Sequence, residues 1–495
     1  AQASGLKWVR HASASFRDRV LIVCAVLWEL MAWFIAGACS SRTPAAAVAA
    51  AAAAALVPTI VERRREPFSR PPALALCDSA TAGPRLTCFG EAMLRYIPDP
   101  DTSGAPLPSR FTSRWLQSAG GAELNLTVAL ANLGWGGRAR WISVVPNGHL
   151  GESLLGLASA AYPDGGAENL QLVRRAEGDV GVYHVWPAEG KVAFQRRNSA
   201  FGLMDPDWFD ESFWLQLLSQ PTEPESLGSL PPPHVLHLTG ITPLIGPRSY
   251  KAWWRALRAA RQLRREAGVH SGAKPRILVT LDLNHRPALG TFEDLWVMVE
   301  PHVGTLDLLV LSIGDLLKLG ELLDIPDAAR MFVDTEVPKG IPGAPALEVA
   351  ARRALAAIQA RLGHKCAIAV CCKQREPLRE PGMPPVQLRW SMTCLKTGEI
   401  VSTRDTGITQ EVLEEIGGGD SWLSGCIDGL VNSESAAQAA APDWSREQWR
   451  AAMRRGDMLA TLKQRQVGDF SHVERSRLDE AIAEHLHSGT AAKKI

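Results

Sequence analysis

Hydrophobic and polar positions follow two alternating patterns along the chain from Arg85 onward. Short, continuously apolar runs predict strands that are buried on both faces, and amphipathic segments with a period near 3.6 predict helices. The predicted strands are RLTCFGEAML (85–94), ARWISVV (139–145), HVLHLTG (234–240), RILVTLDLN (276–284) and LDLLVLS (306–312). The predicted helices include GGAELNLTVALANLG (120–134) and SYKAWWRALRAARQLRREAG (249–268). This order indicates an α/β fold with a mostly parallel central sheet and helices on both faces.

The stretch from Val180 to Ala200 is different, because apolar and polar residues alternate on both sides of a PAEG turn. This alternation predicts a β-hairpin, which could project from the main sheet as a small lid. Two proline-rich segments, PTEPESLGSLPPPH (221–234) and REPLREPGMPPVQ (375–387), have no periodicity and are predicted to be surface loops.

The region before Leu86 is unlike the rest of the chain. Val20 to Ala38 is a long apolar stretch, interrupted only by Glu29, with arginines before it and small residues after it. Residues 1–40 therefore have the layout of a signal segment, and residues 41–85, rich in Ala and Arg, resemble a transit peptide. We expect targeting to a plastid, with secretion or a membrane anchor as alternatives, because the apolar stretch is long enough to span a bilayer.

Composition narrows the range of partners. The 495 residues include 53 Lys and Arg against 52 Asp and Glu, so no overall charge favours nucleic acid, and we expect none to bind. The nine cysteines form no CxxC pair and have no metal-ligand spacing with histidine, which argues against a zinc site or a disulfide framework. We expect reduced, mostly buried thiols, and no stable membrane association of the region after Arg85.

The segment IGGGDSWLSG (416–425) is the strongest candidate for chemistry. Consecutive glycines let backbone N–H groups converge on one point, and the helix predicted from Ser421 adds unpaired donors and a positive dipole end. Gly417, Gly418 and Gly419 are therefore expected to form an anion cradle. Asp420 could accept a hydroxyl proton while the cradle stabilises a transferring phosphoryl group. The alternative is an ordinary N-cap aspartate.

Four motifs in this order, GEAML, GGAELNLTVALANLG, LDLNHRP and GGGDSWLSG, resemble the ribokinase-like (PfkB) sugar kinases. GGAELN, LHLTGITP, LDLNHRP and the late TLKQRQVGDFSHV (461–473) are most similar to 2-keto-3-deoxygluconate kinases. The resemblance covers about residues 86–485. It implies a ribokinase-like kinase domain over residues 86–490, with a β lid that includes about 180–200. It also implies ATP, Mg²⁺ and phosphorylation of 2-keto-3-deoxygluconate to its 6-phosphate.

The resemblance implies roles for individual residues. Asp420 would accept the proton of the substrate's terminal hydroxyl, and Arg196 would pair with the carboxylate of the sugar acid. The residues that would bind the sugar acid are Gly121 and Asn125 from GGAELN, Tyr183 and Arg196 from the hairpin, and Arg286 from LDLNHRP. The residues that would contact ATP are Asn284, Gly417, Gly418 and Gly419.

Some positions depart from the family pattern. SIGD (312–315) stands where NxxE commonly organises the magnesium shell, so Asp315 keeps a carboxylate for an indirect metal role while Ser312 loses the amide. Glu414 stands where Asp is usual, and Gln195 where an aromatic residue is common in the lid. These departures affect metal handling and the grip on the substrate.

Other functions stay open at this point. A fructokinase or another PfkB sugar kinase is the nearest alternative, although Arg196 and Arg286 favour an acid over a neutral hexose. A non-catalytic kinase-fold scaffold is a further alternative, favoured by the altered SIGD and the proline-rich segments. An exposed lid could also pair with a second subunit to form a homo-oligomer.

Overall fold

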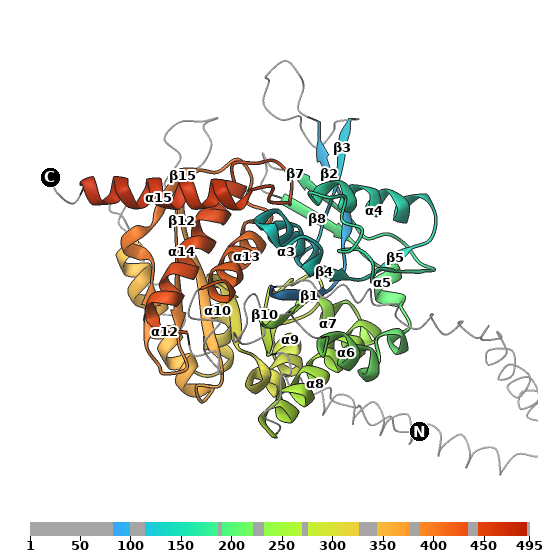
Figure 1. Ribbon diagram of the computed structural model, residues 1–495, viewed down its shortest axis with the longest axis horizontal. Coiled ribbons are helices and arrows are strands. Elements are labelled where there is room, and N and C mark those ends of the chain that lie inside the picture. The colour runs from blue at the N-terminus through green and yellow to red at the C-terminus, as the bar shows by residue number, and fades with distance from the viewer. Residues whose placement is uncertain are drawn as a thin grey trace, which may run out of the picture. The chain divides into compact units, whose positions relative to one another are not determined.

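The computed structural model describes residues 83–99, 114–186, 191–220, 232–269, 276–325, 344–375, 386–433 and 444–492. These residues belong to one unit, which runs from Cys77 to Ile495 (Figure 1). The apolar stretch Val20–Ala38, residues 41–82 of the transit-like stretch and most of both proline-rich segments lie outside the described residues, whereas Arg85 already belongs to the first strand of the unit. Within the described part, no helix is both long enough and apolar enough to cross a bilayer.

A nine-stranded sheet forms the centre of this unit. Its parallel part has the order β12-β11-β10-β9-β1-β4. These strands are β1 (Arg85–Phe89), β4 (Ala139–Ile142), β9 (His234–Thr239), β10 (Ile277–Asp282), β11 (Leu308–Ser312) and β12 (Ala367–Arg375). Beyond β12 the sheet continues antiparallel through β13 (Val386–Cys394), which pairs with β14 (Ile400–Ser402) and β15 (Ile408–Glu411).

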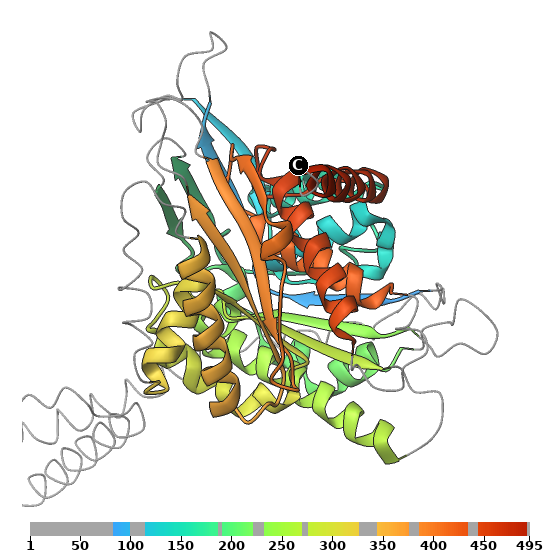
Figure 2. The same cartoon turned by 90° about the vertical axis from the view of Figure 1, so that its left-hand side faces the viewer.

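Burial along the parallel strands explains why they form the middle layer. Every residue of β1 and β9 is buried, as continuously apolar strands require when both faces are covered. One face packs against α3 (Ala122–Leu130), α13 (Gly418–Val431) and α14 (Arg446–Lys463), and α15 (Arg475–Ala492) packs on α14. Figure 2 shows these C-terminal helices on one side of the sheet and α10 (Ile313–Leu322) and α12 (Ala344–Arg361) on the other.

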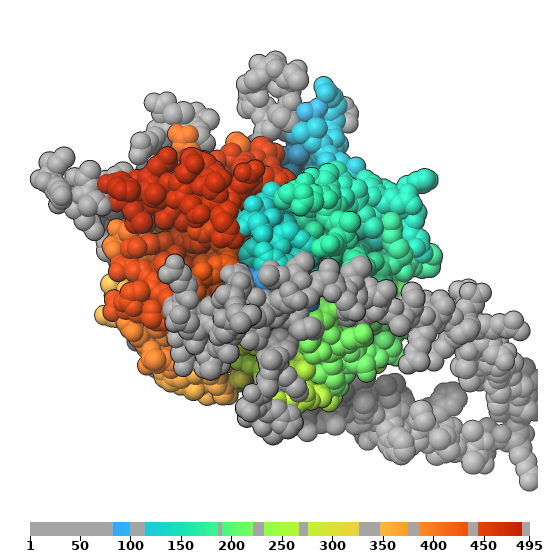
Figure 3. Space-filling model, in the orientation of Figure 1, coloured from blue at the N-terminus to red at the C-terminus, as the bar shows by residue number. Residues whose placement is uncertain are grey.

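The remaining helices complete the two outer layers. They are α4 (His149–Ala161), α5 (Ala200–Leu203), α6 (Glu211–Leu218), α7 (Ile241–Ile245), α8 (Pro247–Val269) and α9 (Phe292–Val299). Short helical turns of other types lie at Ala131–Trp135, Gly136–Arg138, Pro206–Phe209, Glu300–Thr305 and Arg404–Thr406. The turn Ala131–Trp135 contacts α15, so an early and a late segment of the chain meet, and Figure 3 shows teal and red segments adjoining on the surface.

A second sheet of four strands has the order β3-β2-β7-β8 and forms the lid. Its strands are β2 (Met93–Pro98), β3 (Trp115–Gly120), β7 (Val182–Trp186) and β8 (Lys191–Gln195). β7 and β8 pair antiparallel, which confirms the hairpin predicted between Val180 and Ala200. β5 (Val144–Pro146) and β6 (Arg174–Ala176) form a small parallel pair nearby.

Two of the predicted strands are wrong as single elements. The run 85–94 divides into β1 and β2, which belong to different sheets, and the run 139–145 divides into β4 and β5. The first break lies at Gly90, where an added Cβ would be 2.0 Å from the carboxyl carbon of Glu123. The chain can turn past the buried Glu123 side chain only because this position lacks a Cβ, and an apolar pattern alone does not reveal that contact.

The cysteines of the described residues are free thiols, as expected. Cys88, Cys366, Cys372, Cys394 and Cys426 are buried, and Cys371 is partly exposed.

Candidate active site

A cavity of about 430 Å³ opens at the carboxyl ends of the parallel strands. Open α/β sheets bind ligands at this edge, and the ends of β10 and β11 supply one wall here. The lid sheet and the turn before α13 supply the other walls. The lining includes these residues predicted from the sequence: Gly121, Asn125, Tyr183, Arg196, Asn284, Arg286, Asp315, Gly417, Gly419 and Asp420.

The three consecutive glycines have three different environments. α13 begins at Gly418, not at Ser421 as expected, so Gly418 and Gly419 belong to the first helical turn. Gly417 caps the helix with φ of +76°, a left-handed conformation that favours glycine. A Cβ on Gly418 would be 3.0 Å from the Gln464 side chain, whereas Gly419 has open space and lines the cavity. Of the three glycines, Gly417 and Gly419 therefore line the cavity, whereas Gly418 packs against Gln464.

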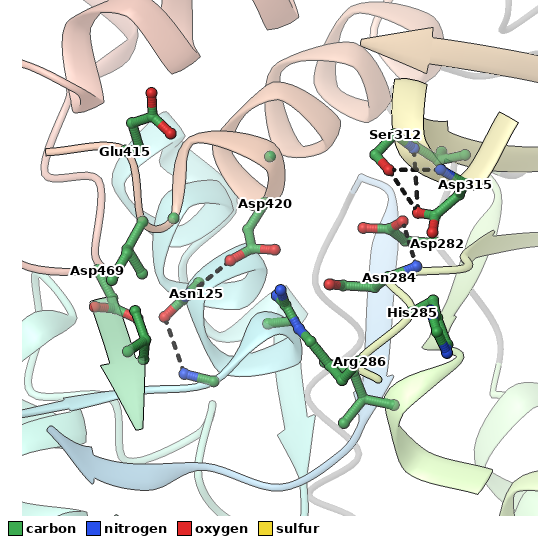
Figure 4. Close-up of a pocket in the computed structure, with 18 of the residues that line it drawn as sticks. Asn125, Asp282, Asn284, His285, Arg286, Ser312, Asp315, Glu415, Asp420 and Asp469 are labelled. Atoms are coloured by element: carbon green, nitrogen blue, oxygen red, sulfur yellow. Dashed lines mark hydrogen bonds between the residues drawn. The ribbon is translucent and has the colours of Figure 1, made fainter. Parts of the chain in front are cut away.

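Asp420 lies in the first turn of α13, and its carboxylate is held from α3. The Asn125 Nδ2 donates a hydrogen bond of 2.7 Å to Asp420 Oδ2 (Figure 4). Burial raises the pKa of Asp420 to about 6, and the hydrogen bond from Asn125 partly opposes that shift. A carboxylate with this pKa is mostly ionised at neutral pH and can still take up a proton, which suits a general base.

Gly121 is a glycine for a structural reason. A Cβ there would be 2.5 Å from the Glu91 carbonyl oxygen, so the start of α3 packs against the chain that joins β1 to β2. The Gly121 N–H donates to Asn125 Oδ1 at 3.3 Å. Gly121 thereby fixes the amide of Asn125 with its Nδ2 toward Asp420.

The end of β10 brings three more groups to the cavity. The Asn284 N–H donates to Asp282 Oδ1 at 3.1 Å, and Asn284 itself has φ of +41°. Burial raises the pKa of Asp282 well above its usual value, and nearby Asp315 and Asp420 raise it further. Arg286 is exposed and extends toward Asp420 in Figure 4. Its guanidinium makes no hydrogen bond or ion pair with any described residue, so it can bind an anion.

Asp315 holds the start of α10. Its carboxylate accepts hydrogen bonds from the Ser312 hydroxyl at 2.8 Å and the Ser312 N–H at 3.4 Å, and the Ser312 hydroxyl caps the helix in return. This is a complete capping box, so one carboxylate oxygen of Asp315 is already engaged. No group of three or more His, Cys, Asp or Glu side chains suited to a metal ion occurs in the described ranges.

The two lid residues predicted to contact the substrate both have protein partners. Tyr183 is buried on β7, and its hydroxyl donates to Asp469 Oδ2 at 2.6 Å. Arg196 follows β8, and its guanidinium lies 3.2 Å from the buried Glu91 carboxylate. Arg196 and Gln195 also line an adjoining cavity of about 1130 Å³, which the first cavity meets at Phe194, Arg196 and Arg286.

Sequence reasoning missed five polar residues of the cavity: Asp282, His285, Lys373, Glu415 and Asp469. Asp282 and His285 lie inside LDLNHRP, and Asp469 inside TLKQRQVGDFSHV, so these two motifs contained a usable signal. Lys373 and Glu415 lie in segments with no motif, and only the fold brings them to the site.

No model of a known protein family matches the sequence. The structure is similar to that of a 2-dehydro-3-deoxygluconokinase from Thermotoga maritima, with a TM-score of 0.56 and 20% identity, covering 81% of this chain and 99% of that one. It is similar to a PfkB family carbohydrate kinase from Listeria grayi, with a TM-score of 0.52 and 18% identity over 81% and 99% of the two chains. A fructokinase from Vibrio cholerae, crystallised with fructose, ADP and calcium, has a TM-score of 0.51 and 16% identity over 80% and 98%. The expected fold is confirmed: the chain has the fold of the PfkB carbohydrate kinases.

Proposed function

We propose that the protein is an ATP-dependent sugar-acid kinase, which phosphorylates 2-keto-3-deoxygluconate on its terminal hydroxyl to give the 6-phosphate. The observation that carries the proposal is the placement of Asp420. Its carboxylate lies in the first turn of α13, beside cavity-lining glycines and within a hydrogen bond of Asn125. The fold and the motifs GGAELN, LDLNHRP and GGGDSWLSG point to the same chemistry.

In the proposed reaction, Asp420 accepts the proton from the substrate hydroxyl as that oxygen attacks phosphorus. Asn125 keeps the carboxylate oriented, and the N–H groups at the start of α13 stabilise negative charge, because a helix N-terminus has unpaired donors. Arg286 binds the substrate by a charge-assisted hydrogen bond to its carboxylate. Tyr183 and Phe194, stacked with ring centroids 5.6 Å apart, cover the site from the lid and exclude water.

The cavity fits ATP and Mg²⁺ on its own chemistry. Gly419 leaves room for phosphate oxygens, Gly417 lines the cavity beside it, and Asn284 offers an amide at the opposite wall. Asp282 and Asp315 would hold the metal, since Mg²⁺ usually takes one or two carboxylates together with phosphates and water. The raised pKa of Asp282 marks a carboxylate that a cation would stabilise. When bound, ATP supplies the phosphoryl group and Mg²⁺ neutralises phosphate charge.

A neutral hexose is the second candidate substrate, and one contact favours it. Arg196 already pairs with Glu91, so one of the two guanidinium groups expected to select an acid has its charge partly balanced. Among the similar structures, the Vibrio cholerae protein is named a fructokinase. A non-catalytic scaffold is the third candidate. It is favoured by the hydrogen bond between Asp315 and the Ser312 hydroxyl, because this bond leaves Asp315 with only one free carboxylate oxygen for a metal ion.

One experiment separates these candidates. Purified protein is assayed for ADP release with 2-keto-3-deoxygluconate, 2-keto-3-deoxygalactonate, fructose and ribose. We expect kcat/KM with the deoxy sugar acids to be at least about tenfold above that with fructose, because a charge-assisted bond contributes about 1.5 to 3 kcal/mol. A preference for fructose would make the protein a fructokinase, and no ADP release with any sugar would support the scaffold.

Two further proposals concern the whole chain. We propose that residues 1–85 direct the protein to a plastid, because an apolar segment followed by an Ala- and Arg-rich stretch suits import in two steps. Residues 1–81 fused to a fluorescent reporter would test this targeting in an algal host, where a uniformly cytosolic signal would refute it.

We also propose a homo-oligomer through the lid, since β8 is an edge strand with Val192 39% and Phe194 41% exposed. Sedimentation equilibrium would measure it.

A further inference from the structure

The tail motif TLKQRQVGDFSHV (461–473) has no part in the chemistry proposed above, yet it reaches the active site. Asp469 lines the cavity and is 4% exposed. Its Oδ2 accepts the hydrogen bond from the Tyr183 hydroxyl at 2.6 Å, and its Oδ1 lies 3.1 Å from Arg95 Nε. Tyr183 belongs to β7 and Arg95 to β2, so one carboxylate holds two strands of the lid.

The same tail also holds the turn that precedes Asp420. Glu414 Oε2 accepts a hydrogen bond of 2.7 Å from the Gly468 N–H, and its other oxygen pairs with Arg95. The Lys463 ammonium, fully buried, donates to the Ile416 carbonyl. Ile416 in turn packs against the lid residues Met93, Tyr183 and Val185. The turn at 414–417 and the lid are therefore joined by ionic and by apolar contacts.

Two glycines make room for Asp469 at this junction. A Cβ on Gly120, at the end of lid strand β3, would be 2.4 Å from Asp469 Oδ2. A Cβ on Gly417 would be 2.0 Å from the Asp469 carbonyl oxygen. The lid on one side and the helix cap of α13 on the other thus both lie in direct contact with Asp469.

Buried charges at this junction oppose any separation of the lid from the turn at 414–417. Arg95, Glu414, Asp469 and Lys463 are all buried, and they carry two positive and two negative charges when ionised. Moving the lid away from the turn would separate Arg95 from Glu414 and Asp469 and leave buried charges without partners. Such a separation is strongly unfavourable, so the lid and the turn are expected to move together.

We propose that Asp469, Arg95 and Glu414 are positioning residues that couple the lid to the nucleotide-binding turn. This inference rests on the proposed function, because it places the nucleotide at the turn 414–417 and the first turn of α13, which follows it directly. A nucleotide that orders this turn also restrains β2 and β7 through Asp469, before any sugar binds. By linkage, a closed lid over the sugar then favours nucleotide binding by the same factor.

Hydrogen exchange of the full-length protein tests this coupling without a sugar substrate. Deuterium uptake of lid peptides that cover Val182–Trp186 is measured with and without a saturating, non-hydrolysable ATP analogue and Mg²⁺. We expect the analogue to slow exchange in these peptides several-fold in the wild type. Arg95→Gln and Tyr183→Phe should each remove most of that slowing, and Arg95→Lys should restore part of it.

The matched control removes a similar ion pair elsewhere in the unit. Arg264 on α8 pairs with the buried Asp307 at 2.7 Å, at the amino end of β11 and away from the cavity. Arg264→Gln is expected to keep the full effect of the analogue on the lid, even if it lowers stability. Tyr183→Phe removes one hydroxyl and keeps the ring, so it carries the test if Arg95→Gln fails to fold.

The outcomes are distinct. Calorimetry on the same samples establishes whether the analogue binds. Binding without slower lid exchange in the wild type, or with equal slowing in Tyr183→Phe and Arg95→Gln, would overturn the coupling and leave the kinase proposal standing. If the analogue does not bind at all, the proposed function fails, and the coupling fails with it.

Discussion

Replacing Asp420 by Asn tests the proposed chemistry most directly. The amide has the shape of the carboxylate, and its oxygen can still accept the 2.7 Å hydrogen bond from Asn125, so the first turn of α13 should keep its geometry. The amide cannot take up the proton of the attacking hydroxyl. We therefore expect turnover to fall while the affinity for ATP stays within about threefold of the wild type.

The size of the loss follows from the role and from the pKa of Asp420. With a pKa of about 6, Asp420 is about 90% ionised at pH 7, so nearly all wild-type molecules carry a competent base. Removing a general base costs about 10²- to 10⁴-fold in rate, which is about 3 to 5 kcal/mol of activation free energy. In the wild type, kcat/KM should fall about tenfold for each pH unit below 6, because protonation removes the base.

The assay is a coupled measurement of ADP release from pH 5 to 9, with ATP affinity measured separately by calorimetry. Asp457→Asn is the matched control, because Asp457 is buried, has a pKa of about 6 and does not line the cavity. Its carboxylate accepts hydrogen bonds from Thr403 at 2.6 Å and Ser391 at 3.0 Å. If Asp420→Asn turned over near the wild-type rate, or if its kcat/KM still fell below pH 6, Asp420 would not be the general base and would only belong to the first turn of α13.

Three more variants test separate parts of the reasoning. Arg286→Ala should raise KM for a deoxy sugar acid about 10- to 100-fold and change KM for fructose much less, and equal effects in steady-state kinetics would remove the argument for an acid substrate. Gly417→Ala combines φ of +76° with a Cβ 2.0 Å from a carbonyl oxygen, so urea unfolding should show a loss of at least about 2 kcal/mol relative to Gly419→Ala, whose Cβ faces open space. Burial raises the pKa of Glu123 to about 7, so the folded state binds its proton more tightly and the free energy of unfolding should fall by up to about 3 kcal/mol between pH 4.5 and 8. Glu123→Gln should flatten that decline, and an unchanged pH dependence would show that Glu123 does not cause it.

Local patterns were sufficient to predict the middle of the sheet. The runs 234–240 and 276–284 match β9 and β10 closely, and the helix predicted at 249–268 lies within α8. These segments are buried on both faces or along one stripe, so their hydrophobicity alone indicates their structure. Asn284 and Arg286 directly follow a predicted strand, and parallel strands end at one edge of the sheet. This position was enough to predict that both residues line the cavity.

Pairing between distant segments could not be predicted in the same way. β2 and β3 were missed as lid strands, because β7 and β8, which complete their sheet, lie much further along the chain. Gly90 must be a glycine because the Glu123 side chain lies against it, and Gly120 because Asp469 does. Neither contact can be predicted from the residues next to these glycines in the sequence. Asp469 lies inside a motif that the sequence singles out, but its contacts with Tyr183 and Arg95 depend on the assembled fold.

The hydrogen bond between Asn125 and Asp420 spans 295 residues, and the one between Tyr183 and Asp469 spans 286. Contacts of this sequence separation form slowly, because a long loop must close before they contribute. During synthesis, the sheet strands up to β12 emerge before α13 and the tail that complete the cavity. A nascent chain that ends before Gly418 lacks α13 and α14 and exposes the apolar face on which they pack, so we expect it to bind chaperones. The cavity is therefore completed only after Asp469 has been synthesised.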